Sequence, residues 1–307
     1  MIMIPGLDRP TRSVSRGIGG VEVLTIIALA GFLILCILTI LPKGRESART
    51  AGCQRNLMQL GVATLLYEQA QHHYPTSAPL SQRPEGESPV GSMLNTFLVP
   101  DFLEFRDAGQ APKATQAPDR SGRVPGLVCP SDFQATTRPS ALSYRANAGD
   151  EADGQTGPFA PGMKVGAAAA EAGDGLSYTA GFAERLIGTG RDGEPGPMNY
   201  ASVAGPVQIP CDPGRFEAHR WRGDAGAAWA EPGWRTSIYT HVVPPNAPAS
   251  CIAEDGRSAA ITASSAHPGR INVWMLDGSA RGVTPSITPA VWRAMGSIRS
   301  TPAERSR

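Results

Sequence analysis

A long uncharged run near the N-terminus sets the strongest limit on how this chain can fold. Residues 23–41 are 19 consecutive residues without a charge, bounded by Glu22 and Lys43. As a helix rising 1.5 Å per residue, the run would be roughly 28 Å long, which matches the hydrocarbon thickness of a bilayer. A cleaved secretory signal usually has a shorter apolar region, of about 7 to 15 residues. We therefore expect a retained transmembrane helix over residues 18–42.

The residues just before this run predict how the helix is oriented. A basic leader ends at Gly17, Ile18 follows it, and Glu22 lies at the head of the apolar run. This arrangement resembles a prepilin-type cleavage and methylation site. The resemblance implies cleavage after Gly17, a methylated Ile18 terminus, a cytoplasmic leader over residues 1–17, and a main domain outside the cytoplasm.

Glu22 has two interpretations. The resemblance to pilin-like proteins implies that its carboxylate meets the free amino terminus of a neighbouring subunit within the membrane, where an unpaired charge is costly. Alternatively, Glu22 is an interfacial carboxylate whose charged group reaches water.

A second helical segment follows the apolar run. Leu57, Leu60, Thr64 and Leu65 recur at the spacing of one helix face, and Pro75 ends the pattern. We expect a stalk helix over residues 43–75.

The rest of the chain reads as short strands separated by turns. The chain contains 35 Gly and 28 Pro but only 6% aromatic residues, which favours many turns and long connections. Apolar segments bounded by turn residues lie at 177–186, 200–207, 236–243, 259–263 and 271–276. The predicted fold class is α+β: a long N-terminal membrane and stalk helix, then a loop-rich antiparallel β domain over residues 76–299 and a disordered tail over 300–307.

Charge and motif content argue against several functional classes. With 28 basic and 27 acidic residues, the chain has no basic excess that would indicate nucleic-acid binding. The sequence has no G-x-S-x-G elbow, no phosphate-binding loop, no H-E-x-x-H and no dinucleotide-binding fingerprint. We therefore expect no enzyme activity, no cofactor and no nucleic-acid partner.

Several short motifs, in a fixed order, resemble a large bacterial family of uncharacterised prepilin-like proteins with a C-terminal H-x9-D-G motif. This family is sometimes listed under a solute-binding heading. The motifs that carry the resemblance are Cys53 to Gly61, Cys129-Pro130-Ser131-Asp132, Ser143 to Gly149, Asp174 to Ser177, Glu184-Arg185, Pro244-Pro245-Asn246, Cys251, His267-Pro268-Gly269 and Asp277-Gly278.

The H-x9-D-G motif does not predict a catalytic dyad. A strand over residues 271–276 would separate His267 from Asp277 by roughly 20 Å, at about 3.3 Å per residue. Asp277 and Gly278 instead predict a tight hairpin turn between this strand and another near 280–283, with positive φ at Gly278. His267 is expected to contact a polar partner at the strand entrance.

The cysteines indicate disulfides more than metal binding. Cys36 lies within the apolar run, and the other four cysteines allow three pairings in an oxidising compartment. Our preferred pair is Cys211 with Cys251. Structural zinc is the alternative, but no C-x2-C is present and the adjacent His72 and His73 point to different helix faces, so no metal site is expected.

Four aromatic residues in a Gly-rich stretch are candidates for ligand contacts: Trp221, Trp229, Trp234 and Tyr239. Their rings could meet a solute or glycan, or could anchor the core and its loops.

Two functional hypotheses follow from the sequence. The first is a pseudopilin-like envelope protein of the bacterial inner membrane, single-pass, with a structural or interaction role and a periplasmic or cell-surface domain. Its expected partners are the membrane, prepilin peptidase, and pilin-like or other envelope proteins. The alternative is a tethered extracytoplasmic module that binds a solute or glycan. An envelope hydrolase is a third possibility without a supporting motif.

Overall fold

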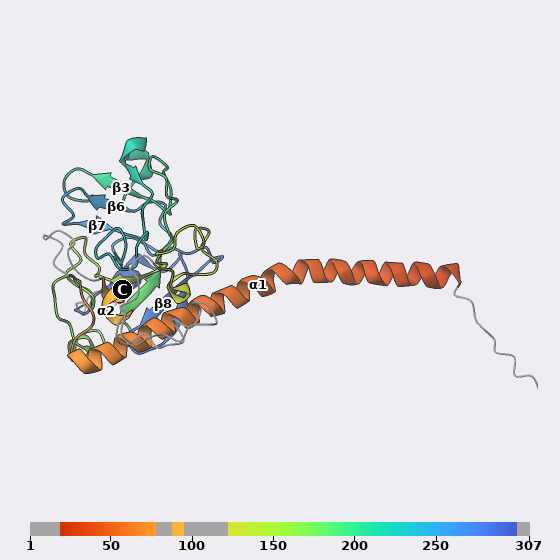
Figure 1. Cartoon of the computed structure of the whole chain (residues 1–307), viewed down its shortest axis with the longest axis horizontal. Helices are drawn as coiled ribbons and strands as arrows, with labels where there is room; N and C mark the ends of the chain where they lie inside the picture. The colour runs from red at the N-terminus through yellow and green to blue at the C-terminus, as the bar shows by residue number, and fades with distance from the viewer. Residues whose placement is uncertain (1–18, 78–87, 95–121, 300–307) are drawn as a thin grey trace, which may run out of the picture. The chain divides into compact units, whose positions relative to one another are not determined.

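The structure is a computed structural model of the whole chain (Figure 1), and it describes residues 19–77, 88–94 and 122–299, without the side chains of residues 37 and 39–43. The chain divides into two compact units, Met1–Arg45 and Glu46–Arg307. The predicted leader, including Gly17 and Ile18, and the predicted tail over 300–307 lie outside the described residues.

The first unit contains the N-terminal part of helix α1 (Gly20–Gln71). The Glu22 carboxylate accepts a hydrogen bond of 3.0 Å from the Gly19 N–H, which satisfies one of the free donors at the helix start. Because α1 runs without a break from Gly20 to Gln71, it contains most of both the predicted membrane segment and the predicted stalk segment. Within the part of the chain that the structure describes, no helix reaches the length and hydropathy required to cross a membrane.

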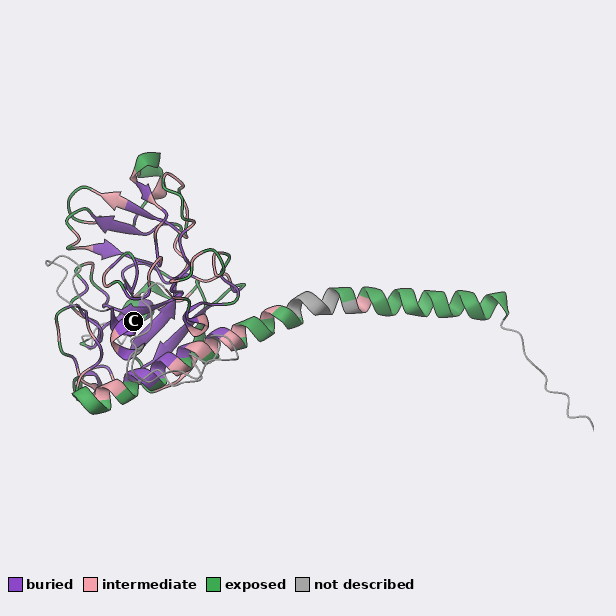
Figure 2. Ribbon diagram, in the orientation of Figure 1, coloured by how far each residue is buried: buried purple, intermediate pink, exposed green. Residues whose placement is uncertain are grey.

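The C-terminal part of α1, from Glu46, belongs to the second unit and buries one face within it (Figure 2). Cys53, Leu57, Leu60 and Thr64 are all fully buried, at a spacing that keeps them on one side of a helix. Leu65, which the periodicity placed on this face, is 37% exposed. The small residues Cys53 and Ala63 complete the buried face in its place.

The second unit contains two sheets. The five-stranded sheet has the order β5-β1-β2-β8-β9, and the four-stranded sheet has the order β4-β3-β6-β7. The strands are β1 (Tyr144–Asn147), β2 (Ala180–Glu184), β3 (Tyr200–Val203), β4 (Trp221–Arg222), β5 (Ile238–Tyr239), β6 (Cys251–Ala253), β7 (Ala259–Ala260), β8 (Ile271–Met275) and β9 (Ala280–Val283).

The prediction of an antiparallel β domain is correct only in part, since most strand pairs are antiparallel but two are not. Strand β1 pairs with β5 in parallel, and β3 pairs with β6 in parallel, so both sheets are mixed. Each parallel partner follows a long connection, and a strand of two or three residues carries no signal of its pairing direction. The α+β class itself is confirmed.

Short helices complete the unit: α2 (Pro89–Leu94), α4 (Ala167–Ala172), α5 (Pro289–Gly296) and the 3-10 turns η1 (Pro125–Leu127), η2 (Pro213–Arg215) and η3 (Ala218–Arg220).

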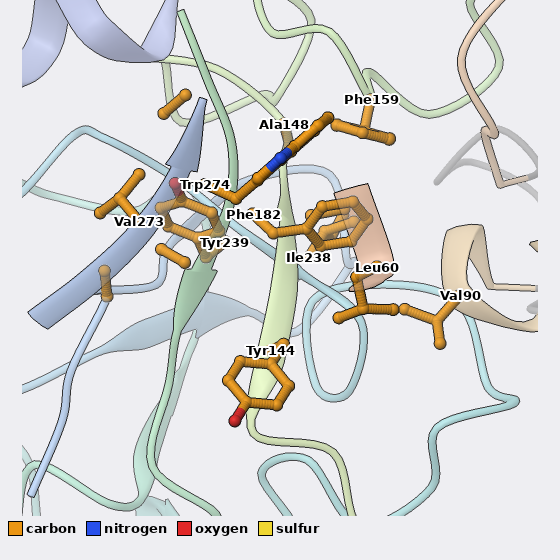
Figure 3. Close-up of a cluster of buried hydrophobic side chains, with 14 of the residues drawn as sticks. Leu60, Val90, Tyr144, Ala148, Phe159, Phe182, Ile238, Tyr239, Val273 and Trp274 are labelled. Atoms are coloured by element: carbon orange, nitrogen blue, oxygen red, sulfur yellow. The ribbon is translucent and has the colours of Figure 1, made fainter. Parts of the chain in front are cut away.

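The main hydrophobic core lies between the five-stranded sheet and α1. Figure 3 shows Leu60 of α1, Val90 of α2, and Phe182 and Trp274 of the sheet in this core. The indole of Trp274 lies so close to Gly61 and to Gly181 that a methyl group at either position would overlap the ring. Glycine at position 61 thus lets the helix approach the sheet closely.

A smaller core lies on one face of the four-stranded sheet. Neighbouring residues on its strands alternate between the two cores: Tyr200 and Ile252 face the main core, and Ala201 and Cys251 face the smaller one. This alternation is the two-residue period of a strand with both faces covered.

Candidate functional site

His267 lies at the centre of a buried group of polar side chains. Its Nδ1 lies 2.5 Å from Glu46 Oε1, and its Nε2 lies 3.2 Å from Glu184 Oε1 and 3.4 Å from Cys129 Sγ. Cys129 forms a disulfide with Cys53 of α1. We call Glu46, Cys53, Cys129, Glu184 and His267 the His267 cluster.

Separate segments of the chain contribute the five residues. Glu46 and Cys53 lie on α1, Cys129 follows η1, Glu184 ends β2, and His267 precedes β8. Four of these side chains belong to residues that are at most 4% exposed, while the side chain of Glu46 is 26% exposed. The cluster therefore joins the stalk part of α1 to the sheet.

The two carboxylates control the charge of His267. Burial alone would lower its pKa, but the hydrogen bonds and charges of Glu184 and Glu46 outweigh burial and raise the pKa above its ordinary value. Each ring nitrogen of His267 faces one carboxylate, so both carboxylates have a polar partner.

A second layer of hydrogen bonds holds both carboxylates. The Ser131 hydroxyl lies 3.1 Å from each oxygen of Glu46. Asn272 donates to Glu184 twice, from its backbone N–H at 2.7 Å and from its side-chain amide at 3.0 Å. Gln54 of α1 donates to the Asn272 side chain at 3.1 Å, which closes the network around the helix.

Arg185 directly follows Glu184, the last residue of β2, and its side chain points toward the four-stranded sheet. Its guanidinium donates to the carbonyls of Pro197, Met198 and Asn199 and to the hydroxyls of Ser250 and Ser264. Burial lowers the pKa of Arg185 to about 10, although the charge of Asp132 acts in the opposite direction. Glu184 and Arg185 thus link the His267 cluster to Asn199 and Ser250, the residues just before β3 and β6 of the four-stranded sheet.

Asp132 ends the Cys-Pro-Ser-Asp motif and supports the same region. Its carboxylate accepts hydrogen bonds from the backbone N–H groups of Gln134 and Ile187 and from the Ser143 hydroxyl. Burial raises the pKa of Asp132 despite these bonds. The motifs that contain Cys53, Cys129 and Glu184 all reach His267, because Glu184 and Cys129 lie beside its imidazole and Cys53 is bonded to Cys129.

The H-x9-D-G motif divides between two places, as its spacing predicts. His267 contacts polar partners at the entrance of β8, and the antiparallel β8–β9 hairpin turns at Gly278, which has φ of 91°. Asp277 accepts hydrogen bonds from the Ser279 N–H and hydroxyl. These bonds and the nearby Arg281 lower the pKa of Asp277, against a raising effect of burial.

The second disulfide is the pair preferred from the sequence, Cys211–Cys251. Its neighbours in the smaller core are apolar, among them Trp221 and Ala260. The Cys53–Cys129 bridge is the pairing that remains for the other two of these four cysteines.

The four aromatic candidates for ligand binding are core residues. Trp221, Trp229, Trp234 and Tyr239 are between 0% and 3% exposed, so their faces are covered by the protein itself. Trp229 and Trp234 donate from Nε1 to the carbonyls of Gly122 and Gly256. In the structure these four side chains therefore anchor the core and its loops.

A groove lies beside the stalk part of α1. It has a volume of about 490 Å³, and its polar lining includes Arg55, Asn56 and Gln59 of the helix and Arg123 from the facing segment. This volume is in the range of small-molecule sites, about 300 to 1,000 Å³. None of the four aromatic candidates lines the groove.

The fold and site define a class of protein: a disulfide-bonded α+β domain built on the C-terminal half of a long N-terminal helix. The chain belongs to the family described as proteins of unknown function, DUF1559, whose model (SBP_bac_10) matches residues 42–290. The match confirms the family anticipated from the motifs, and it does not include residues 17–22. No curated protein and no solved structure matches the chain.

Proposed function

We propose that the protein is a single-pass, membrane-anchored envelope protein with a structural or interaction role, whose domain lies outside the cytoplasm. The observation that carries this proposal is the apolar surface of α1. Eleven large apolar side chains between Val21 and Leu38 are 44% to 75% exposed. Contiguous apolar surface of this kind indicates contact with a membrane or another protein, and the uncharged sequence run has the length of a bilayer crossing.

The His267 cluster supports the same role from the other half of the helix. A disulfide and the Glu46–His267 contact fix the stalk part of α1 to the rest of the domain, and Glu184 of β2 holds His267 from the sheet, so an anchor on the helix would hold the domain. Two covalent crosslinks also suit an oxidising compartment outside the cytoplasm.

Membrane extraction tests the anchor. The full chain, produced in a bacterium, is expected to stay in the membrane pellet after an alkaline carbonate wash and to dissolve only in detergent. Leu29→Arg together with Leu33→Arg should release it, because each arginine at the centre of a membrane helix costs roughly 2.5 to 3.5 kcal/mol. The matched control, Leu65→Arg and Leu66→Arg on the stalk part, should stay in the pellet. Release of the unaltered chain by carbonate would overturn the anchor.

Processing is tested separately by mass spectrometry of the N-terminal peptide. A methylated Ile18 terminus that disappears in Gly17→Ala is the expected result. An intact Met1 terminus would contradict the prepilin pathway and leave a plain membrane-tethered domain.

The groove beside α1 favours a second candidate function, a tethered module that binds a small anionic solute. Arg55 and Arg123 place two guanidinium groups on its lining, and guanidinium groups pair with carboxylate or phosphate oxygens. A thermal-shift screen with dicarboxylates and inorganic phosphate should raise the melting temperature. The shift should vanish in Arg55→Ala with Arg123→Ala and persist in Arg191→Ala, an exposed control; absence of any shift counts against this candidate.

A further inference from the structure

The geometry points to a redox-gated metal site in the His267 cluster: once the Cys53–Cys129 disulfide is reduced, Cys53, Cys129, Glu184 and His267 bind a divalent cation of the zinc type. The inference goes beyond the proposed function and does not depend on the membrane anchor. Its starting observation is that one ligand atom from each of these four residues lies within 4.8 Å of all the others.

Two edges of a coordination tetrahedron are already present. Zinc binds nitrogen and oxygen at about 2.0 to 2.2 Å and sulfur at about 2.3 Å, so neighbouring ligand atoms in a tetrahedral site lie roughly 3.3 to 3.7 Å apart. In the structure, His267 Nε2 lies 3.2 Å from Glu184 Oε1 and 3.4 Å from Cys129 Sγ. The two sulfur atoms must move apart, which reduction of their bond permits, and the remaining pairs of ligand atoms already lie within 4.8 Å.

The surroundings of these four residues have the organisation of a metal site. A ligating histidine usually donates its second N–H to a carboxylate, and ligating carboxylates are themselves hydrogen-bonded. His267 Nδ1 lies 2.5 Å from Glu46, and Glu184 accepts two hydrogen bonds from Asn272. These contacts leave Nε2 as the atom for the metal and fix the imidazole ring before any metal arrives.

The ligand types select the cation. Thiolate and imidazole ligands favour Zn²⁺ and related transition metals, whereas Ca²⁺ and Mg²⁺ prefer sites made only of oxygen. All four residues are at most 4% exposed, so two thiolates without a cation would be unpaired buried charges. Metal binding neutralises that charge.

The chemical steps balance with a dithiol as the reductant. The dithiol gives two electrons and two protons to the S–S bond, which breaks to two thiols while the dithiol closes to its own disulfide. The cation then displaces the two thiol protons and the Nε2 proton of His267. In reoxidation a disulfide oxidant accepts the two electrons and two protons and becomes a dithiol, while the two sulfur atoms bond again and release the cation, so disulfide and metal exclude each other.

Closely spaced cysteines and histidines are the usual sequence signal of a structural zinc site. Here the four ligands come from four separate segments, which only the fold brings together. Local spacing therefore carried no sign of the site.

The test is a Co²⁺ titration of the full chain in detergent, before and after reduction with a dithiol that is then removed under anaerobic conditions. The reduced protein should bind one equivalent of Co²⁺ and show the intense visible bands of a tetrahedral site with a thiolate-to-cobalt transition; the oxidised protein should show neither. Zn²⁺ should displace the cobalt. His267→Ala or Glu184→Gln should weaken binding at least tenfold.

Matched cysteine variants separate this site from the other disulfide, which the reductant also opens. Binding should persist in Cys211→Ala with Cys251→Ala and vanish in Cys53→Ala with Cys129→Ala. If reduction loosens the fold, Zn²⁺ should restore the near-ultraviolet circular dichroism, because binding stabilises the folded state. Three results overturn the inference: no binding after reduction, binding that survives loss of Cys53 and Cys129, or a loosened fold that Zn²⁺ does not restore.

Discussion

The two disulfides lie in very different surroundings. Cys53–Cys129 lies at the edge of the main core beside an imidazole and a buried carboxylate, and it joins α1 to the rest of the domain. Cys211–Cys251 lies in the smaller core, where its neighbours are apolar. The Cys211–Cys251 disulfide is therefore a crosslink within an apolar core, whereas the Cys53–Cys129 disulfide is part of a polar cluster.

The largest loss of stability in either region should appear when its disulfide is removed. Closing a loop of n residues stabilises by an amount that grows with ln n, and the sequence separations are 76 and 40. Loss of Cys53–Cys129 should cost about 4.5 kcal/mol of unfolding free energy, and loss of Cys211–Cys251 about 4 kcal/mol.

The measurement for this pair is urea unfolding of the two double-alanine variants in mild detergent, followed by tryptophan fluorescence. A reversed order of the two midpoints would show that local surroundings, rather than loop length, decide how much each bridge stabilises.

Acid should weaken the main core more than the smaller one. Burial lowers the pKa of His241 to about 3, despite a hydrogen bond to the Trp292 carbonyl that acts to raise it. The unfolded chain takes up a proton near pH 6.5 and the folded chain does not, so stability falls as pH drops below 6.5 and continues to fall to about 3. The slope approaches about 1.4 kcal/mol per pH unit once the pH is well below 6.5, which amounts to about 2 kcal/mol between pH 6.5 and 4.5.

Urea unfolding across this pH range checks the effect. His241→Gln, which can still accept from the Tyr239 hydroxyl and donate to the Trp292 carbonyl, should lose this part of the pH dependence. An unchanged slope in the variant would assign the acid sensitivity to other groups. The stability of the smaller core should depend less on pH over this range. His219, the histidine nearest to Trp221 in sequence, has a side chain that is 65% exposed and is not part of that core.

A smaller effect is expected where α1 meets the main core. Gly61→Ala would push a methyl group into the Trp274 indole, and overpacking of this kind typically costs about 1 to 3 kcal/mol. Gly52→Ala on the same helix is the matched control. There the nearest atom, Pro130 Cγ, lies 3.8 Å from the added carbon, so the change should stabilise by up to about 1 kcal/mol through helix propensity. Equal midpoints for the two variants in thermal unfolding would contradict the close approach.

Helical periodicity identified the packed part of α1 but not its full face. Leu57, Leu60 and Thr64 are buried as predicted, whereas Leu65 is exposed and Cys53 lies on the buried side. Small or weakly apolar residues contribute little to a hydropathy pattern, although they allow the closest packing. All five predicted strand segments contain a strand. The parallel pairs, however, join segments far apart in sequence and have no local signal.

The site shows the same limit of sequence reasoning. The hairpin at Asp277 and Gly278 was predictable, since turn chemistry depends on a few neighbouring residues. The partners of His267 were not, because Glu46 and Glu184 approach it from distant segments. For the aromatic residues, composition alone could not distinguish a ligand surface from a core.

The Cys53–Cys129 bridge also determines how the domain would respond to mechanical tension. A pull on α1 from its N-terminal side would enter the domain at Cys53 and continue through the sulfur bridge to Cys129. The chain between these two residues would lie outside that line of force and could not be drawn out while the bridge is intact. Reduction would lengthen the extensible chain and expose the Trp274 contact with the helix to the load.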